Sequence, residues 1–217
     1  MNISWLGHSC FKIEAKSNGD NITILIDPYD ESIGLKMSKT KAEIVLITHD
    51  HHDHNNLNAV KGEPFVIKSP GEYEIKKVFV YGIPTYHDDK QGSERGANIA
   101  YRIDVDDLSV VHLGDLGHVL NDEQLELLED ADILMIPVDS KYTLGAKKAS
   151  EVIAQIEPRI VIPMHYKVPG LKIDLDPIDA FCKEMGVKNT PIAEDKLKIS
   201  KKDLMTEETK VIILPRQ

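Results

Sequence analysis

The stretch "ITHDHHDHNN", residues 47–56, gathers four histidines and two aspartates directly after the apolar run "EIVLI". Imidazole nitrogens and carboxylate oxygens suit zinc and its first-row neighbours, and a site needs three or four such ligands at one point. If the chain is extended here, His49 and His51 point to the same side; if a helix begins near Asp53, that carboxylate and His54 turn toward the same pocket. A strand end followed by a helix start is the setting that such a motif requires. The segment therefore predicts a metal site, and the alternative is a histidine-rich surface loop.

The elements predicted around this segment are strands in the first half of the chain, and helices that alternate with strands in the second half. Strands are predicted in the first half by apolar and β-branched runs such as "NISWL", "CFKIEA", "NITILI", "AEIVLI", "PFVIK", "KVFVYGI", "NIAYRIDV" and "SVVHL", with turns at "KSNGD", "SPGE" and "DVDDL". In the second half, the helices predicted at "NDEQLELLEDA", "GAKKASEVIAQIEP" and "DPIDAFCKEMG" alternate with strands at "DILMIPV" and "RIVIPM". This order indicates an α/β fold of mixed sheets covered by helices, and the length and the lack of long linkers indicate one domain, residues 1–217.

The composition excludes several classes of protein. The two cysteines, Cys10 and Cys182, form no C-x-x-C pair, so neither a disulfide framework nor a thiolate zinc site is expected. A net charge of −10 disfavours nucleic acid as a partner, because such binding depends on Lys and Arg against phosphates. The first residues lack a signal-peptide pattern, and no window approaches the roughly 20 apolar residues of a membrane span. We therefore expect a cytoplasmic protein without membrane association.

A family resemblance adds to this interpretation. "THDHHDH" matches T-H-x-H-x-D-H, the signature of the metallo-β-lactamase fold superfamily, and "GIPTYHD", "SVVHLGDLGH" and "RIVIPMHY" each place a further candidate ligand at a strand end. The N-terminal "WLGHSCFKIE" and "TILIDPY" resemble the branch that includes L-ascorbate-6-phosphate lactonase. The resemblance covers nearly the whole chain and implies a four-layer αββα sandwich of two mixed β-sheets flanked by helices.

The resemblance also implies a complete set of ligands for two metal ions. The first ion would be bound by His49, His51 and His87, the second by Asp53, His54 and His165, and Asp115 would bridge them. Taken singly, a histidine at a strand end is more often a hydrogen-bonded structural residue, and an aspartate between two glycines can simply hold a turn. The motif favours the ligand role for all of them.

Two divalent ions can share a water, lower its pKa toward neutrality and polarise a substrate oxygen. The expected reaction is attack by the shared hydroxide on a carbonyl or phosphoryl centre, with Asp53 as the catalytic residue that orients the hydroxide and accepts its proton. Zinc is the expected metal, and manganese and iron accept the same ligands. The superfamily's redox flavoproteins usually carry glutamate at the second motif position, where this chain has His51, so hydrolysis is favoured.

Four residues are candidates for contact with a substrate. His8 in "LGHSCF" can reach the rim of the site, with a capping or core role as the alternative. Arg95 and Asn98 belong to "HDDKQGSERGAN", whose composition suggests a mobile loop able to close on an anionic group, or simply a solvated loop. Tyr142 in "DSKYTLGA" follows a predicted strand, where a substrate loop is expected.

The sequence thus predicts a metal-dependent hydrolase of a small, anionic or cyclic substrate such as a lactone or phosphoester. A non-catalytic metal-binding or sensing protein is the main alternative, supported only by Asp139 and Ser140 where relatives carry a glycine pair. A nuclease is the third reading, and homo-oligomer formation is left open.

Overall fold

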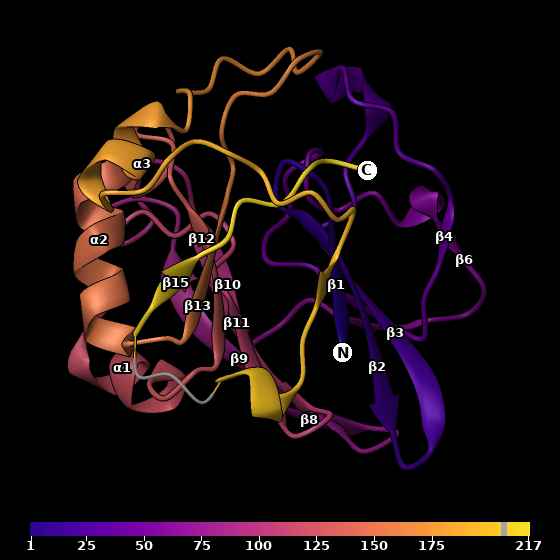
Figure 1. The fold of residues 1–217 in the computed structure, drawn as a ribbon. Helices are drawn as coiled ribbons and strands as arrows, with labels where there is room; N and C mark the ends of the chain where they lie inside the picture. Colours follow the sequence, from indigo (N-terminus) through magenta and orange to yellow (C-terminus); the bar gives the residue numbers. More distant parts are fainter. Residues whose placement is uncertain (205–207) are drawn as a thin grey trace.

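The computed structural model describes residues 1–204 and 208–217, and two β-sheets dominate it (Figure 1). The first sheet has six strands in the order β14-β1-β2-β3-β5-β7. Its strands are β1 (Asn2–Gly7), β2 (Cys10–Ser17), β3 (Asp20–Ile26), β5 (Ile44–Leu46), β7 (Phe65–Ile67) and β14 (Leu197–Lys198). Antiparallel pairing joins β14 through β3, and parallel pairing joins β3, β5 and β7.

The second sheet has seven strands in the order β15-β13-β12-β11-β10-β9-β8. Its strands are β8 (Gly71–Ile75), β9 (Val78–Tyr86), β10 (Ala97–Val105), β11 (Leu108–His112), β12 (Ile133–Pro137), β13 (Ile160–Met164) and β15 (Lys210–Val211). The strands from β8 to β11 alternate in direction, whereas β11, β12, β13 and β15 run parallel. The carboxyl ends of β9, β11 and β13 therefore meet at one edge of this sheet.

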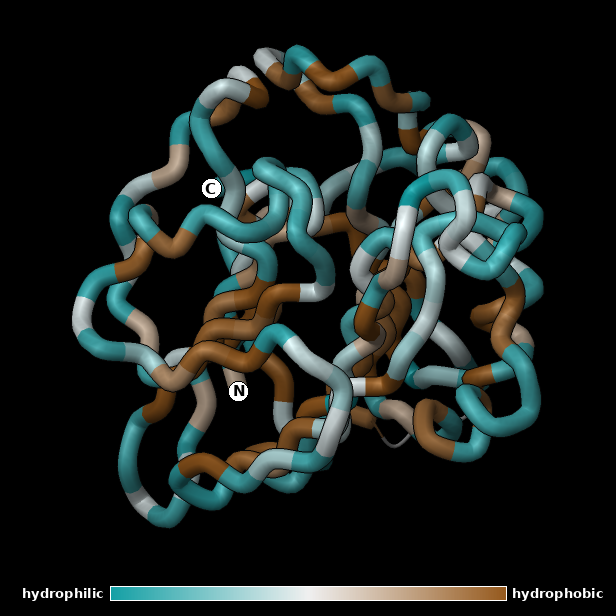
Figure 2. Tube along the Cα trace, turned by 180° about the vertical axis from the view of Figure 1, so that it is seen from behind, coloured by the Kyte–Doolittle hydropathy of each residue, from teal (hydrophilic) through white to brown (hydrophobic). Residues whose placement is uncertain are grey.

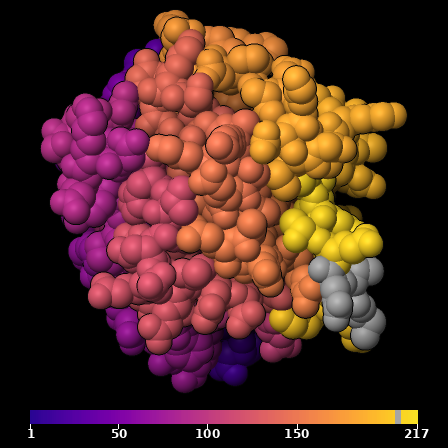
Figure 3. Space-filling model, turned by 90° about the vertical axis from the view of Figure 1, so that its left-hand side faces the viewer, coloured from indigo at the N-terminus to yellow at the C-terminus, as the bar shows by residue number. Residues whose placement is uncertain are grey.

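Three α-helices lie beside the second sheet, on the left of Figure 1. They are α1 (Asp122–Leu128), α2 (Gly145–Ile156) and α3 (Asp179–Glu184). The helix predicted at "NDEQLELLEDA" is present as α1, and a capping box between Asn121 and Gln124 begins it. Figure 3, which views this side, shows α2 and α3 in orange as a continuous cover.

The opposite side of the molecule carries short elements. They are the 3-10 turns η1 (Glu31–Ile33) and η2 (Leu57–Ala59) and the parallel pair β4 (Thr40–Lys41) and β6 (Val60–Lys61), while a third 3-10 turn, η3 (Lys201–Leu204), lies near the end of the chain. The predicted architecture of two mixed sheets with flanking helices is confirmed, with a thinner cover on this side than on the helical side.

One hydrophobic core joins the two sheets. It includes Phe11 and Ile24 from the first sheet and Ile103 and Val110 from the second, all fully buried. Figure 2 shows hydrophobic segments concentrated in the strands and hydrophilic segments in the surrounding loops. Burial at roughly 25 cal/mol per Å² of apolar surface makes this core the main stabilising element beneath the strand ends.

Two local expectations differ from the structure. No helix begins near Asp53, because residues 52–54 form a turn in which the His54 amide donates to the His51 carbonyl at 2.9 Å. Asn56 then caps the 3-10 turn η2 with its side chain, a local hydrogen bond that competes with helix formation. The turn predicted at "SPGE" is shorter than expected, since the strand β8 already begins at Gly71.

The helices in the described part of the chain are all too short or too polar to cross a membrane.

Candidate metal centre

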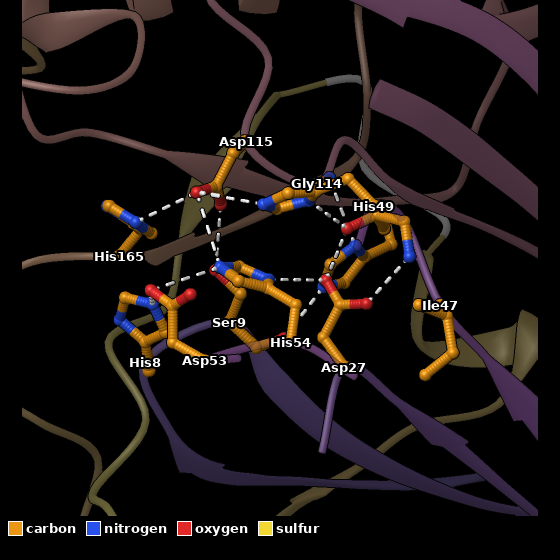
Figure 4. Close-up of polar contacts among 12 residues, drawn as sticks. His8, Ser9, Asp27, Ile47, His49, Asp53, His54, Gly114, Asp115 and His165 are labelled. Atoms are coloured by element: carbon orange, nitrogen blue, oxygen red, sulfur yellow. Dashed lines mark hydrogen bonds and ion pairs between the residues drawn. The ribbon is translucent and has the colours of Figure 1, made fainter. Parts of the chain in front are cut away.

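Chemically active side chains gather where strands of both sheets end (Figure 4). The segment after β5 supplies His49, His51, Asp53 and His54, as the sequence predicts. The second sheet contributes three more residues, each within three positions of a strand end: His87 after β9, Asp115 after β11 and His165 after β13. Residues up to 116 positions apart are thus brought to one place by the topology.

The carboxylate of Asp115 is the hub of this cluster. Its Oδ2 lies 3.1 Å from His165 Nε2, 3.2 Å from His87 Nε2 and 3.3 Å from His54 Nε2. His49 Nε2 is 3.9 Å from the same oxygen. The carboxylate is buried, and Ser9 donates a hydrogen bond to its other oxygen. The alternative in which Asp115 only holds a turn does not account for four imidazoles around one oxygen.

A second carboxylate, Asp27 at the end of β3, supports the histidines from behind. It accepts hydrogen bonds from the backbone amide and the hydroxyl of Thr48, at 2.8 and 2.7 Å. The Nδ1 atom of His54 lies 3.0 Å from Asp27, and the Thr48 hydroxyl lies 2.9 Å from His49 Nδ1. These contacts leave the Nε2 atoms of both rings to face the cluster. Partners of this kind orient metal-binding imidazoles and fix their tautomer.

The segment with the histidines is also anchored to the second sheet. The Tyr101 hydroxyl donates to the Ile47 carbonyl at 2.9 Å, and the Ile99 amide donates to the Thr48 carbonyl at 2.9 Å. Gly114 packs so closely here that a Cβ atom would lie 2.3 Å from Asn98 Oδ1. Glycine at position 114 thus allows the segment after β11, which carries Asp115, to pack closely against the beginning of β10.

His8 does not line the rim as expected. It is fully buried between β1 and β2, and its Nε2 lies 3.1 Å from Asp53 Oδ2. Its ring centroid is 4.3 Å from that of His165, and its carbonyl accepts the His165 amide at 3.2 Å. Because burial separates the ring from solvent, the structure places His8 as a support for Asp53 instead of a contact for substrate.

The ionisation of the cluster follows from burial and mutual charge. Burial, reinforced by His54, lowers the pKa of His49 to about 2, which keeps the ring neutral with a free lone pair. Burial would raise the pKa of Asp115, but His165 and His54 hold it well below its usual range. For His54 burial is likewise outweighed, and Asp115 and Asp27 raise its pKa well above the ordinary value. Metal binding at His54 would therefore release a proton.

The residues fit a bound metal ion. Donor atoms of His49, His51 and His87 lie within 4.8 Å of one another, and so do those of His49, His54 and Asp115. In the described part of the chain, the buried His49 Nε2 has no hydrogen-bond partner. A buried imidazole nitrogen without a partner is costly unless something else satisfies it, and a bound cation would do so.

A third group of donors was not predicted. His8, His54 and His165 also bring nitrogen atoms within 4.8 Å of one another. The quoted motif "LGHSCF" holds the signal for it, since His8 sits at a strand end like the predicted ligands. The supporting roles of Asp27 and Thr48 were also missed, although "TILIDPY" places Asp27 directly after a strand.

A pocket of about 380 Å³ opens onto the cluster, which is within the usual range for small-molecule sites. Its lining includes Asp53, Asp115 and, from outside the cluster, Arg95 and Tyr142. Of the residues predicted to contact substrate, these last two are therefore the ones that the structure brings to the pocket.

Asn98 is not suited to the role predicted for it. It is 1% exposed, and its amide nitrogen donates to Thr85 Oγ1 and the Leu113 carbonyl. Its amide oxygen accepts the Asp115 backbone N–H at 3.0 Å. The side chain is thus committed to holding Asp115, because the residue belongs to β10 and not to the preceding loop.

Replacing Asp27 by Asn tests the support for His54. An amide has one accepting oxygen where the carboxylate has two, so at least one of the three donor groups of Thr48 and His54 loses its acceptor. We expect metal affinity to fall about 10- to 100-fold. Titration of metal against a chelating dye measures this, with the exposed Asp30→Asn as control for the lost charge. Equal affinity in Asp27→Asn and Asp30→Asn would contradict this role.

Comparison with known proteins shows which family the chain belongs to. Residues 2–165 match the family model described as the beta-lactamase superfamily domain. A UPF0173 metal-dependent hydrolase from Pyrobaculum calidifontis is 30% identical over 82% of this chain and 89% of its own length. Another from Staphylothermus marinus is 29% identical over 98% and 95% of the two chains.

A solved structure is similar over its full length. It belongs to a Thermotoga maritima protein described as a candidate Zn-dependent hydrolase of the metallo-β-lactamase superfamily. The two chains are 34% identical, the TM-score is 0.79, and the match covers 100% of this chain and 99% of the other. The chain therefore belongs to the metallo-β-lactamase superfamily, among its UPF0173 metal-dependent hydrolases. The resemblance stated from the sequence is thus confirmed.

Proposed function

We propose that the protein is a binuclear hydrolase of a small anionic or cyclic substrate, such as a lactone or a phosphoester. The observation that carries this proposal is the convergence of four imidazoles on the single oxygen Asp115 Oδ2, between 3.1 and 3.9 Å. The pocket beside this oxygen admits a small molecule and has two carboxylates in its lining.

The proposed ligand sets are those that the family resemblance implies, and the proximity of the donor atoms of His49, His51 and His87 supports the first of them. His49, His51 and His87 would hold one ion, Asp53, His54 and His165 the other, and Asp115 would bridge them. Zinc is the metal that we expect, and manganese or iron would accept the same donors. When bound, two such ions supply an acidified water and a Lewis acid for the substrate oxygen.

Residues of the chain would then orient the attacking water and accept its proton. Asp53 lines the pocket, and His8 holds its Oδ2 atom at 3.1 Å. Burial would raise the pKa of Asp53, but the hydrogen bond from His8 and the charge of His54 lower it overall. Asp53 is therefore ionised at neutral pH, as a group that orients the attacking water and accepts its proton must be, although the lowered pKa makes it a weaker base.

Three further expectations complete the proposal. We propose that residues 1–217 form one domain, that the protein works in the cytoplasm and that its partner is a small molecule rather than nucleic acid. Whether copies of the chain associate is left to a measurement of mass in solution.

Hydrolysis by the metal-loaded protein tests the proposed function. Protein reconstituted with zinc, manganese or ferrous iron is offered a lactone, a phosphomonoester and a phosphodiester, each before and after treatment with a chelator. We expect turnover of at least one substrate, loss of turnover with chelator and recovery when metal is restored. Tight metal binding without turnover of the whole panel would instead support the metal-sensing alternative.

A further inference from the structure

The loop between β9 and β10 is built around one carboxylate, Asp88. One of its oxygens accepts the backbone amides of Lys90 and Gly92, at 2.8 and 2.9 Å. The other accepts those of Glu94 and Arg95, at 3.0 and 2.7 Å. The Asp88 side chain is buried, although the sequence on either side of it contains polar residues. A loop predicted to be mobile is thus folded tightly around an anion of its own.

The last residue held in this way is Arg95, which reaches the pocket of the metal centre. Its guanidinium donates to the Lys141 carbonyl at 3.1 Å and lies 5.7 Å from the centroid of the Tyr142 ring. A cation within about 6 Å of an aromatic ring is attracted to its face. One N–H group is used by the carbonyl, so others of the planar fork are left for a ligand.

Two lysines close to Arg95 are paired with carboxylates at short distance, whereas Arg95 has only a longer contact of 3.9 Å between its Nη1 and Glu94 Oε2. Lys141 forms an ion pair with Asp174 at 2.8 Å, and Lys148 pairs with Asp89 at 2.9 Å. Among the described residues that line the pocket, Arg95 is the only one with a permanent positive charge. A planar guanidinium at the wall of a small pocket is suited to two-point binding of a carboxylate or phosphate group.

We propose that Arg95 is an anion-binding subsite of the substrate pocket and that Asp88 is the positioning residue that presents it. The substrate would carry a carboxylate or phosphate group apart from the bond that is cleaved, bound by Arg95 while the cleaved bond lies at Asp115. This inference rests on the proposed function and narrows its substrates to molecules with such a second anionic group.

Binding of inorganic phosphate to the metal-loaded protein, followed by calorimetry, tests the subsite. The variants are Arg95→Met, Arg95→Lys, Asp88→Asn and the double variant Arg95→Met/Asp88→Asn, with Lys147→Met as control. Lys147 is exposed on α2 and does not line the pocket, so its loss changes the charge equally without touching the pocket. Metal content is measured on every preparation, which separates failure of the metal centre from failure of the subsite.

We expect Arg95→Met to weaken phosphate binding about 10- to 100-fold at unchanged metal content, with a smaller recovery in Arg95→Lys. Asp88→Asn should weaken it about 3- to 10-fold, because an amide accepts at only one of its two positions. The double variant should bind phosphate no more weakly than Arg95→Met alone, because Asp88 acts on phosphate only through Arg95. Equal binding by wild type and Arg95→Met would overturn the subsite. Additive losses in the double variant would overturn the positioning role of Asp88.

Discussion

Replacing Asp115 by Asn is expected to reduce kcat/KM by at least about 10⁴-fold, roughly 5 kcal/mol of transition-state stabilisation. The substitution keeps the size of the side chain but removes the negative charge on which His54, His87 and His165 converge within 3.3 Å. Both proposed ions share this carboxylate, so both should bind more weakly. Steady-state kinetics and metal content of the purified variant measure the two effects.

A charge-matched control separates this effect from a general loss of negative charge. Asp130 lies on the exposed turn after α1, and Asp130→Asn should leave kinetics and metal content unchanged. Retention of two ions per chain and near-normal turnover by Asp115→Asn would show that this carboxylate does not bridge a metal pair.

The second large effect is expected for Asp53→Ala. We expect kcat to fall by about 10²- to 10⁴-fold, the usual contribution of a general base. Metal content should fall from about two ions per chain to about one, because the ligands proposed for the first ion remain intact. A drop in turnover together with the loss of one ion would distinguish Asp53 from a residue that only orders the pocket.

The same segment offers a matched control for Asp53. Asp50 is exposed, and its carboxylate accepts a hydrogen bond from Asn55 at 2.6 Å, outside the cluster. Asp50→Ala should therefore keep both ions and nearly full turnover. If Asp53→Ala also kept them, the assignment of Asp53 to the second ion and to proton transfer would be wrong.

Part of the centre was predictable because strand ends can be recognised in a sequence. His87, Asp115 and His165 each follow an apolar run, and parallel directions of β9, β11 and β13 bring such ends to one edge. The motif around His49 and His51 needed no topology, since its members are neighbours in the chain.

The supporting contacts could not be predicted in the same way. Asp27 and His54 are 27 positions apart, and only the parallel pairing of β3 with β5 places them within 3.0 Å. Asn98 was assigned to a loop because it follows two glycines and an arginine, yet it pairs with Thr85 across β9 and β10. In both cases the contacts of the residue depend on strand pairing between separate segments, and the local composition does not predict that pairing.

The fold was predictable where periodicity and caps agreed. The helix α1 was predictable from the Asn and Asp that open "NDEQLELLEDA" and from its leucines at helical spacing. The turn at residues 52–54 was not, because it is followed by hydrogen bonds from Asn55 to Asp50 within the segment and from Asn56 to the carbonyl of Tyr29 in another segment. Side chains that bond to distant backbone or carboxylate groups leave no periodic signal.

The most direct test is the number of metal ions per chain, measured by plasma mass spectrometry on protein purified without chelator and again after reconstitution with zinc. We predict close to two ions per chain, held by the two sets of ligands that share Asp115. A value that stays at or below one after reconstitution would contradict the binuclear centre, and no bound metal at all would contradict the metal centre itself.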